Sequence, residues 1–333
     1  MADAVTVWRR SSPDAIERDL AALWRETARE GPLSRALMAN LVVIQQCDDP
    51  AEDAGAAALE AAAGDVAQRH PVRAILLDYT PGVETPGAPK AVRVGLRTFG
   101  SSAARYGVDL IALQVECAKA SIPSIVRRLT RGGVPTSVWW IGDLSKHPPP
   151  ELMPTLGRQF LYDSASWQDP REGLRIVAGV IARPHSPDMA DLSWRRMAPM
   201  RRAIVHGLGT EPDARELRAT GVDIRHGASR AADALLLAGW LHGSLGWSSA
   251  EVPRIEESRD PADALSAVLT GGDWAVKASM DERRVIVTGT TQTAFEVIVP
   301  RETEAEQVVA ELLSLGADMA LHAAVRAAAI LAQ

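Results

Sequence analysis

The sequence predicts an α/β protein with two domains. The first is an N-terminal α/β domain with a mixed, Rossmann-like sheet that lacks a dinucleotide fingerprint, and the second is a smaller α+β domain with an antiparallel meander. Short apolar runs alternate with helical segments through most of the N-terminal half, as in α/β folds. Three closely spaced strands follow near the C-terminus. The length of 333 residues also exceeds the ~250–300 residues that one hydrophobic core supports.

The chain begins with a predicted amphipathic helix over residues 12–29. Ser12 is a good N-cap and Pro13 suits the first helical position. The pair that starts at Gly31 is Gly-Pro, which ends a helix. Residues 1–30 are therefore expected to form an N-terminal helix that packs on the first domain.

Strands and helices then alternate through residues 31–207, the predicted α/β domain. The segments 92–98 and 108–115 flank a Gly/Ser-rich turn and are expected to pair. Pro199 predicts a kink or a split in the last helix. The other predicted strands are 41–47, 72–79, 134–141 and 159–162, and the predicted helices are 50–68, 121–129, 149–156, 170–181 and 191–206.

A domain boundary is predicted near residues 207–212, so the α+β domain spans 208–333. Residues 229–245 are apolar on nearly every helical face, which predicts a helix buried inside this domain. Short polar turns join three successive strands, which predicts the antiparallel meander. These strands are 274–278, 284–288 and 294–299, and the helices 303–313 and 317–331 finish the chain.

Charge and hydropathy restrict the partners. The net charge of −6 argues against a general nucleic-acid binder and against an anionic membrane surface. The N-terminus lacks the basic head and apolar stretch of a signal peptide. The longest apolar run, 234–241, is far shorter than the ~20 residues of a membrane span. We expect a cytoplasmic protein that binds neither nucleic acid nor membrane.

Sequence signatures of catalysis are missing. The first predicted strand ends in two aspartates, Asp48 and Asp49, where a dinucleotide site needs glycines. The chain has no P-loop, no G-x-S-x-G nucleophile elbow, and neither H-x-x-x-H nor C-x-x-C ligand spacing. The sequence therefore predicts a protein that is not an enzyme and has no catalytic residue, cofactor or metal.

Cys47 and Cys117 are the two cysteines, and both fall at or just beyond the ends of predicted strands. If those strands are neighbours, a reversible disulfide is conceivable. The alternative is a pair of ordinary buried thiols.

Tryptophan and arginine mark the candidate binding residues. The chain has nine tryptophans but three phenylalanines and three tyrosines, and four arginines lie within residues 195–202. Trp and Arg are enriched at the centres of protein interfaces. Three interpretations stay open: a solvated basic helix face, a docking surface for an acidic patch, and a phosphate-metabolite site. The candidates are Trp139, Trp140, Asp163, Ser164, Trp167, Trp194, Arg195, Arg196, Arg201 and Arg202.

Several separated blocks of the sequence resemble one known family, the glucose-6-phosphate dehydrogenase assembly proteins (OpcA family), and they occur in the family's order. The blocks are Ile16 to Trp24, Ala39 to Val43, Gln68 to Ile75, Ile122 to Leu129, Val134 to Trp140, Tyr162 to Ala165, Asp191 to Pro199, Ala238 to Leu241 and Leu245 to Trp247.

This resemblance implies a non-catalytic assembly factor or allosteric activator in the oxidative pentose phosphate pathway. Such a protein binds glucose-6-phosphate dehydrogenase and promotes its active oligomer. The alternative function is a metabolite-binding protein or an enzyme that holds a sugar phosphate through Arg195, Arg196 or Arg201.

Overall fold

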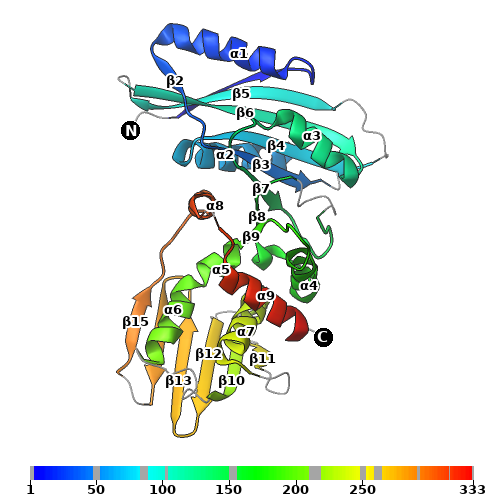
Figure 1. Ribbon diagram of the computed structural model, residues 1–333. Helices are drawn as coiled ribbons and strands as arrows, with labels where there is room; N and C mark the ends of the chain where they lie inside the picture. Colours follow the sequence, from blue (N-terminus) through cyan, green and yellow to red (C-terminus); the bar gives the residue numbers. More distant parts are fainter. Residues whose placement is uncertain are drawn as a thin grey trace. The chain divides into compact units, whose positions relative to one another are not determined.

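A computed structural model describes residues 4–47, 53–82, 89–101, 104–149, 156–209, 219–247, 253–258, 265–290, 293–314 and 316–331. The chain forms two compact units, and neither is continuous in sequence. The N-terminal unit contains residues 1–142, 149–162 and 303–316, and the C-terminal unit contains residues 143–148, 163–302 and 317–333. The structure confirms the predicted α/β class, with a mixed sheet and a second, largely antiparallel sheet (Figure 1).

The N-terminal unit is built on a mixed sheet in the order β1-β5-β6-β4-β3-β7-β8, with β2 beside β6. The central strands β6, β4, β3, β7 and β8 are parallel, whereas β1 and β5 are antiparallel additions at one edge. The strands are β1 (Val5–Arg10), β2 (Leu33–Arg35), β3 (Ala39–Gln46), β4 (Val72–Pro81), β5 (Ala91–Ser101), β6 (Ala104–Cys117), β7 (Thr136–Ile141) and β8 (Gln159–Tyr162).

Helices cover both faces of this sheet, which is why β3 and β4 are buried along nearly their whole length. Helices α1 and α3 lie on one face, and α2 and α8 lie on the other. The helices are α1 (Ile16–Thr27), α2 (Asp53–Arg69), α3 (Ile122–Leu129) and α8 (Glu304–Leu313), with short 3-10 turns at Ala28–Glu30 and Lys119–Ser121.

Trp139 and Trp140 are neighbours in β7 and are both buried. Successive side chains of a strand point to opposite faces. Trp140 packs in an aromatic row with Tyr79 and Phe160, with ring centroids 6.3 and 6.2 Å away. Trp139 shares the opposite face with Gln159, whose amide donates to a carbonyl of α8. Both indoles are therefore packed inside the fold, and neither is exposed for a partner.

The buried guanidinium of Arg73 ties β4 to elements on one face of the sheet. Its Nη1 donates to Asp109 at 3.0 Å and its Nε donates to the carbonyl oxygen of Leu129, at the end of α3, at 2.8 Å. It also pairs with Glu17 of α1. Arg73 is 1% exposed and Asp109 is 6% exposed, and each is the other's most buried charged partner. Asp109 also lies 3.4 Å from the half-exposed Arg35.

Replacement of Arg73 by methionine should lower the free energy of unfolding by about 3 kcal/mol, because Asp109 loses its buried cation and keeps only the half-exposed Arg35, and the carbonyl oxygen of Leu129 loses its donor. Urea unfolding followed by tryptophan fluorescence measures the change. Arg18→Met is the matched control, because Arg18 is an exposed α1 arginine in a surface ion pair, and its effect should stay within about 0.5 kcal/mol. Equal stabilities for the two variants would contradict a structural role for the buried pair.

The C-terminal unit contains a sheet in the order β11-β10-β12-β13-β14-β15, antiparallel except for β10 and β11. The predicted meander is confirmed as β13-β14-β15. The strands of this sheet are β10 (Ala219–His226), β11 (Arg254–Glu257), β12 (Leu265–Gly271), β13 (Trp274–Met280), β14 (Arg284–Gly289) and β15 (Phe295–Ile298). Strand β9 (Asp188–Asp191) also falls in this unit but is not part of this sheet.

Helices cover one face of this second sheet, and buried and exposed residues accordingly alternate along β10, β12 and β14. Helix α6 packs on β13 and β14, and α7 packs on β10 and, on its other side, on α9. The helices are α4 (Pro170–Ile181), α5 (Leu192–Arg196), α6 (Ala198–Gly207), α7 (Ala231–Leu245) and α9 (Met319–Leu331), with 3-10 turns at Ser164–Ser166 and Ala228–Arg230.

Helix α7 is buried almost all round, as its apolar sequence predicted. It approaches α9 so closely at Gly239 that a Cβ there would collide with the carbonyl oxygen of Ala324. This contact requires glycine because the backbones of the two helices meet directly.

The structure corrects several predictions. The unit boundary does not fall at residue 207, because residues 163–207 pack with the C-terminal unit and α8 packs with the N-terminal unit. Helix α1 begins at Ile16 without a side-chain cap, so Ser12 is not its N-cap. The strands β1, β2, β9, β10, β11 and β12 were not predicted, and the predicted helix over 149–156 lies largely outside the described residues. No described helix has the length and apolar character needed to span a bilayer.

Candidate functional site

The candidate site is built on the segment 191–206, which forms two short helices where one was predicted. Helix α5 ends at Arg196 and α6 begins at Ala198, with Met197 between them. Pro199 lies in the first turn of α6, where its missing N–H costs nothing. The predicted split is therefore confirmed, and it gives the segment two helix directions within the C-terminal unit.

Asp191 fixes the start of α5. Its Oδ1 accepts the backbone N–H of Ser193 at 2.9 Å and that of Ser164 at 3.2 Å, so one carboxylate caps a helix and holds a neighbouring turn. Asp191 is 1% exposed. Burial, and after it the nearby charge of Asp163, raise its pKa to about 7.

Two further carboxylates complete this buried polar cluster. Asp163 receives a bidentate pair from Arg196, with bonds of 2.6 and 2.9 Å. Asp233 of α7 accepts the hydroxyl of Ser193 and lies 3.4 Å from Arg230. Burial raises the pKa of Asp233 as well. The cluster joins α5, α7 and the turn at Ser164–Ser166 through charged groups that are largely withdrawn from water.

The arginines of the segment are held by neighbouring groups. Arg195 forms a bidentate pair with Glu302, with bonds of 2.8 and 2.9 Å. The guanidinium of Arg201 lies 3.5 Å from the ring centroid of Trp194, a cation–π contact. The indole N–H of Trp194 donates to Asp318 at 2.8 Å. These contacts brace the junction of α5 and α6 and fix the orientation of α6.

Helix α6 presents a row of exposed side chains, Arg202, Val205 and His206, which we call the α6 stripe. Positions three and four apart lie on one helical face. Val205 is 51% exposed, which is high for an aliphatic side chain. The His206 ring meets Phe295 of β15 edge-on at 5.0 Å between ring centroids, so the stripe continues onto the sheet edge. The 3.6-residue spacing from Arg202 could have revealed Val205 and His206 in the sequence.

The structure brings only part of the predicted site together. Trp139 and Trp140 are buried in the N-terminal unit, and Ser164 and Trp194 are buried in the C-terminal unit. Trp167 is also buried and packs against Gly173 of α4. Asp163, Arg195, Arg196 and Arg201 are half-buried in the contacts described above, and Arg202 is the exposed member of the predicted set. Burial was not evident from the sequence, because Trp suits both a core and an interface.

The two cysteines are free thiols, and their strands are not neighbours. Cys47 follows β3 and Cys117 ends β6, and β4 lies between these strands. Strands are ~4.8 Å apart, so two spacings exceed the ~7 Å limit between Cα atoms that a disulfide can bridge. The condition for the conceivable disulfide is therefore not met, and a bond would require backbone movement. Burial raises the pKa of Cys117, which disfavours the reactive thiolate.

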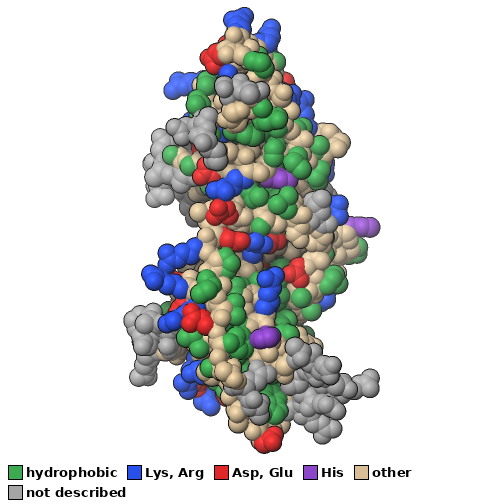
Figure 2. All heavy atoms as spheres, turned by 90° about the vertical axis from the view of Figure 1, so that its left-hand side faces the viewer, with side chains coloured by type: hydrophobic (Ala, Val, Ile, Leu, Met, Phe, Trp, Pro, Cys, Tyr) green, Lys and Arg blue, Asp and Glu red, His purple; other side chains and the backbone are tan. Residues whose placement is uncertain are grey.

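Among the described residues, no group of three or more histidine, cysteine or acidic side chains is arranged to hold a metal ion. On the described part of the face drawn in Figure 2, basic, acidic and hydrophobic side chains are interspersed.

The fold and site together define a two-unit α/β protein that carries a braced helix with an exposed stripe. Residues 63–178 match the family model described as the N-terminal domain of a glucose-6-phosphate dehydrogenase subunit, and residues 187–325 match the model of its C-terminal domain. Together the two matches cover most of the chain. The chain belongs to the glucose-6-phosphate dehydrogenase assembly protein family, the OpcA family.

One similar solved structure is UDP-N-acetylglucosamine 3-dehydrogenase GnnA from Acidithiobacillus ferrooxidans. The identity is 10%, the TM-score is 0.44, and the match covers 90% of this chain and 96% of that one. A likeness this weak implies nothing about activity or substrate. No curated protein matches the sequence.

Replacement of Asp191 by asparagine should flatten the pH dependence of stability. The folded-state pKa of about 7 lies above the unfolded value near 3.9, so the folded protein holds a proton that the unfolded chain has lost. The wild type therefore loses stability as the pH rises from about 4 to 7, and the loss is complete above pH 7.

Asparagine does not titrate, so Asp191→Asn should not show this loss. The free energy of unfolding of the variant minus that of the wild type should therefore rise by about 2–3 kcal/mol between pH 5 and pH 8. Urea unfolding at both pH values measures this difference. Asp281→Asn is the control, because hydrogen bonds from the backbone of Arg283 and Arg284 lower the pKa of that exposed carboxyl. A constant difference between Asp191→Asn and the wild type would refute the raised pKa.

Proposed function

We propose that this protein is a non-catalytic assembly factor and allosteric activator that binds glucose-6-phosphate dehydrogenase and promotes its active oligomer. The observation that supports this proposal is the order of the two family matches, which follow one another along the chain and are both named for a subunit of that enzyme. The proposal includes action in the cytoplasm, within the oxidative pentose phosphate pathway.

Mass action supplies a mechanism that needs no chemistry by this chain. A partner that binds only the assembled enzyme stabilises it by RT ln(1 + [L]/Kd), about 2.7 kcal/mol at a hundredfold excess over the dissociation constant. That free energy shifts a weakly associating enzyme by about a hundredfold toward its oligomer. If the assembled enzyme is the active one, assembly appears as activation.

The α6 stripe is the surface that we assign to this contact. Arg202 carries an exposed positive charge beside the aliphatic Val205, a combination suited to a hydrophobic contact with an acidic rim. The Arg201–Trp194 contact and the packing of α6 on β13 and β14 hold the helix in place before binding. A surface ordered in advance loses little conformational entropy when a partner docks.

The alternative function, a sugar-phosphate site formed by Arg195, Arg196 and Arg201, has less support from this geometry. Glu302 and Asp163 already engage Arg195 and Arg196, each through two hydrogen bonds. Arg201 lies against the Trp194 ring. A phosphate would have to displace these contacts, whereas the α6 stripe needs no rearrangement.

Adding this protein to dilute cognate glucose-6-phosphate dehydrogenase should raise both the activity and the oligomer fraction of the enzyme. Enzyme assays and analytical ultracentrifugation over the same concentrations measure the two quantities. The increase should saturate and should fade at high enzyme concentration, where the oligomer forms unaided. If both proteins are folded and neither quantity changes, the proposed function is wrong.

The double variant Arg202→Glu with Val205→Asp should require at least a tenfold higher concentration for half-maximal activation, because it reverses a charge and removes an apolar contact. Titration of the enzyme with each variant provides this value. Lys277→Glu is the matched control, because Lys277 is exposed on the face of the C-terminal sheet that points away from α6. An unchanged titration curve for the double variant would place the interface elsewhere.

A further inference from the structure

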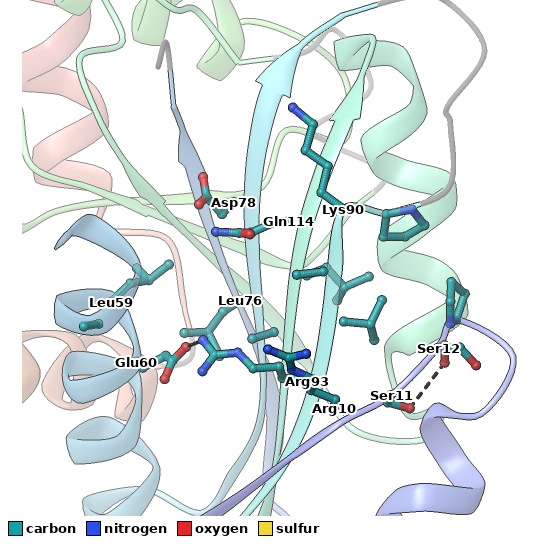
Figure 3. A pocket seen from close by; sticks show the side chains of 17 residues that line it. Arg10, Ser11, Ser12, Leu59, Glu60, Leu76, Asp78, Lys90, Arg93 and Gln114 are labelled. Carbon is teal, nitrogen blue, oxygen red and sulfur yellow. Dashed lines mark hydrogen bonds and ion pairs between the residues drawn. The ribbon is translucent and has the colours of Figure 1, made fainter. Parts of the chain in front are cut away.

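The N-terminal unit contains a cavity of about 800 Å³ that the assembly function leaves unused. It lies over β4, β5 and β6 on the face of the sheet that α2 covers, and the chain after β1 closes one side (Figure 3). Asp78 and Gln114 place it toward the carboxyl ends of the parallel strands, the end of the sheet at which open α/β folds bind ligands.

Sheet register explains why this space is open. Asp78, Gln114 and Ala91 are successive partners across β4, β6 and β5, and Leu76, Ala112 and Arg93 form the adjacent row. Each row contains an alanine where a larger side chain would fill the cavity. The two rows thus form the base of the cavity. One row carries the polar pair Asp78 and Gln114, and the adjacent row carries the guanidinium of Arg93.

The polar pair offers acceptors to hydroxyl groups. Oδ1 of Asp78 is buried and has no hydrogen-bond partner among the described residues, which is costly for a carboxylate oxygen. The Gln114 side chain lies beside it (Figure 3). A carboxylate and an amide on adjacent strands suit a ligand that carries neighbouring hydroxyl groups. A hydroxyl can donate a hydrogen bond to the carboxylate of Asp78. Another can donate to, or accept from, the amide of Gln114.

The other part of the cavity is basic. Arg10 of β1 lies directly opposite Arg93 of β5, and like charges at paired positions of a sheet are destabilising. Arg93 is compensated by Glu60 and lies over the Trp8 ring. Arg10 forms no ion pair among the described residues and lies next to Ser11 and Ser12. An anion bound here would neutralise the uncompensated charge.

We propose that this cavity binds a phosphorylated sugar or polyol, with its phosphate held by Arg10 and Ser12 and its hydroxyl groups held by Asp78 and Gln114. None of the described residues that line the cavity is aromatic, so these residues offer no ring on which a nucleobase would stack. A sugar phosphate combines the anionic group and the hydroxyl groups that the two parts of the cavity require.

Isothermal titration of the full-length protein alone tests this site, with glucose 6-phosphate, ribose 5-phosphate, glucose and inorganic phosphate as separate probes. Because no dehydrogenase is present, the result is independent of the proposed assembly function. We expect at least one sugar phosphate to bind tenfold more tightly than both glucose and inorganic phosphate.

Asp78→Asn and Arg10→Ala should each weaken that binding by tenfold or more. Asp78→Asn should leave the affinity for inorganic phosphate unchanged, whereas Arg10→Ala should weaken both. Arg128→Ala is the control, because this exposed arginine lies on α3, over the opposite face of the sheet, and should have no effect.

Three outcomes would overturn the proposal: no binding of either sugar phosphate, affinity no better than that of inorganic phosphate, or affinity unaffected by Asp78→Asn and Arg10→Ala. Circular dichroism confirms that each variant is folded. Neither side chain forms an ion pair or a hydrogen bond with another described residue, so loss of binding in a folded variant reports on the ligand contact itself.

Discussion

A single buried carboxylate organises the C-terminal unit around the candidate binding surface. Asp191 accepts two backbone N–H groups through one oxygen and thereby joins the cap of α5 to the turn that precedes α4. This arrangement fixes where α5 begins. Burial makes the ionised form expensive, which is why the pKa rises to about 7. Helix α5 leads through Met197 into α6, which carries the stripe.

The N-terminal unit uses a buried charge in a comparable way. Arg73 connects β4 with α1, β6 and the end of α3 through three acceptors. Such pairs add little net stability compared with an apolar core, but they penalise any alternative arrangement that leaves one partner without the other. Both units therefore combine large apolar cores with a few ionic contacts that fix how helices meet.

The two proposed binding sites differ in chemistry and belong to different units. The α6 stripe is an exposed helix face with both charged and apolar side chains, suited to another protein. The cavity over β4–β6 has a mixed lining that includes basic and hydroxyl-binding side chains, suited to a small phosphorylated ligand. A protein that carries both would combine the binding of an enzyme with the sensing of a metabolite. Because the two sites share no residue, each can be altered while the other is left intact.

The sequence by itself determined the α/β class, most helices and central strands, the split at Pro199 and the meander, since local periodicity and turn chemistry decide these features. Tertiary structure decided the rest. Edge strands such as β1 lack a clear apolar pattern because one side faces water. The assignment of α8 to the N-terminal unit depends on packing between residues that are far apart in the sequence. Three features depend on contacts between residues that are distant in sequence, so no local sequence pattern could predict them. They are the burial of Trp139, Trp140 and Trp194, the ion pairs of Arg195 and Arg196, and the cavity beside Asp78.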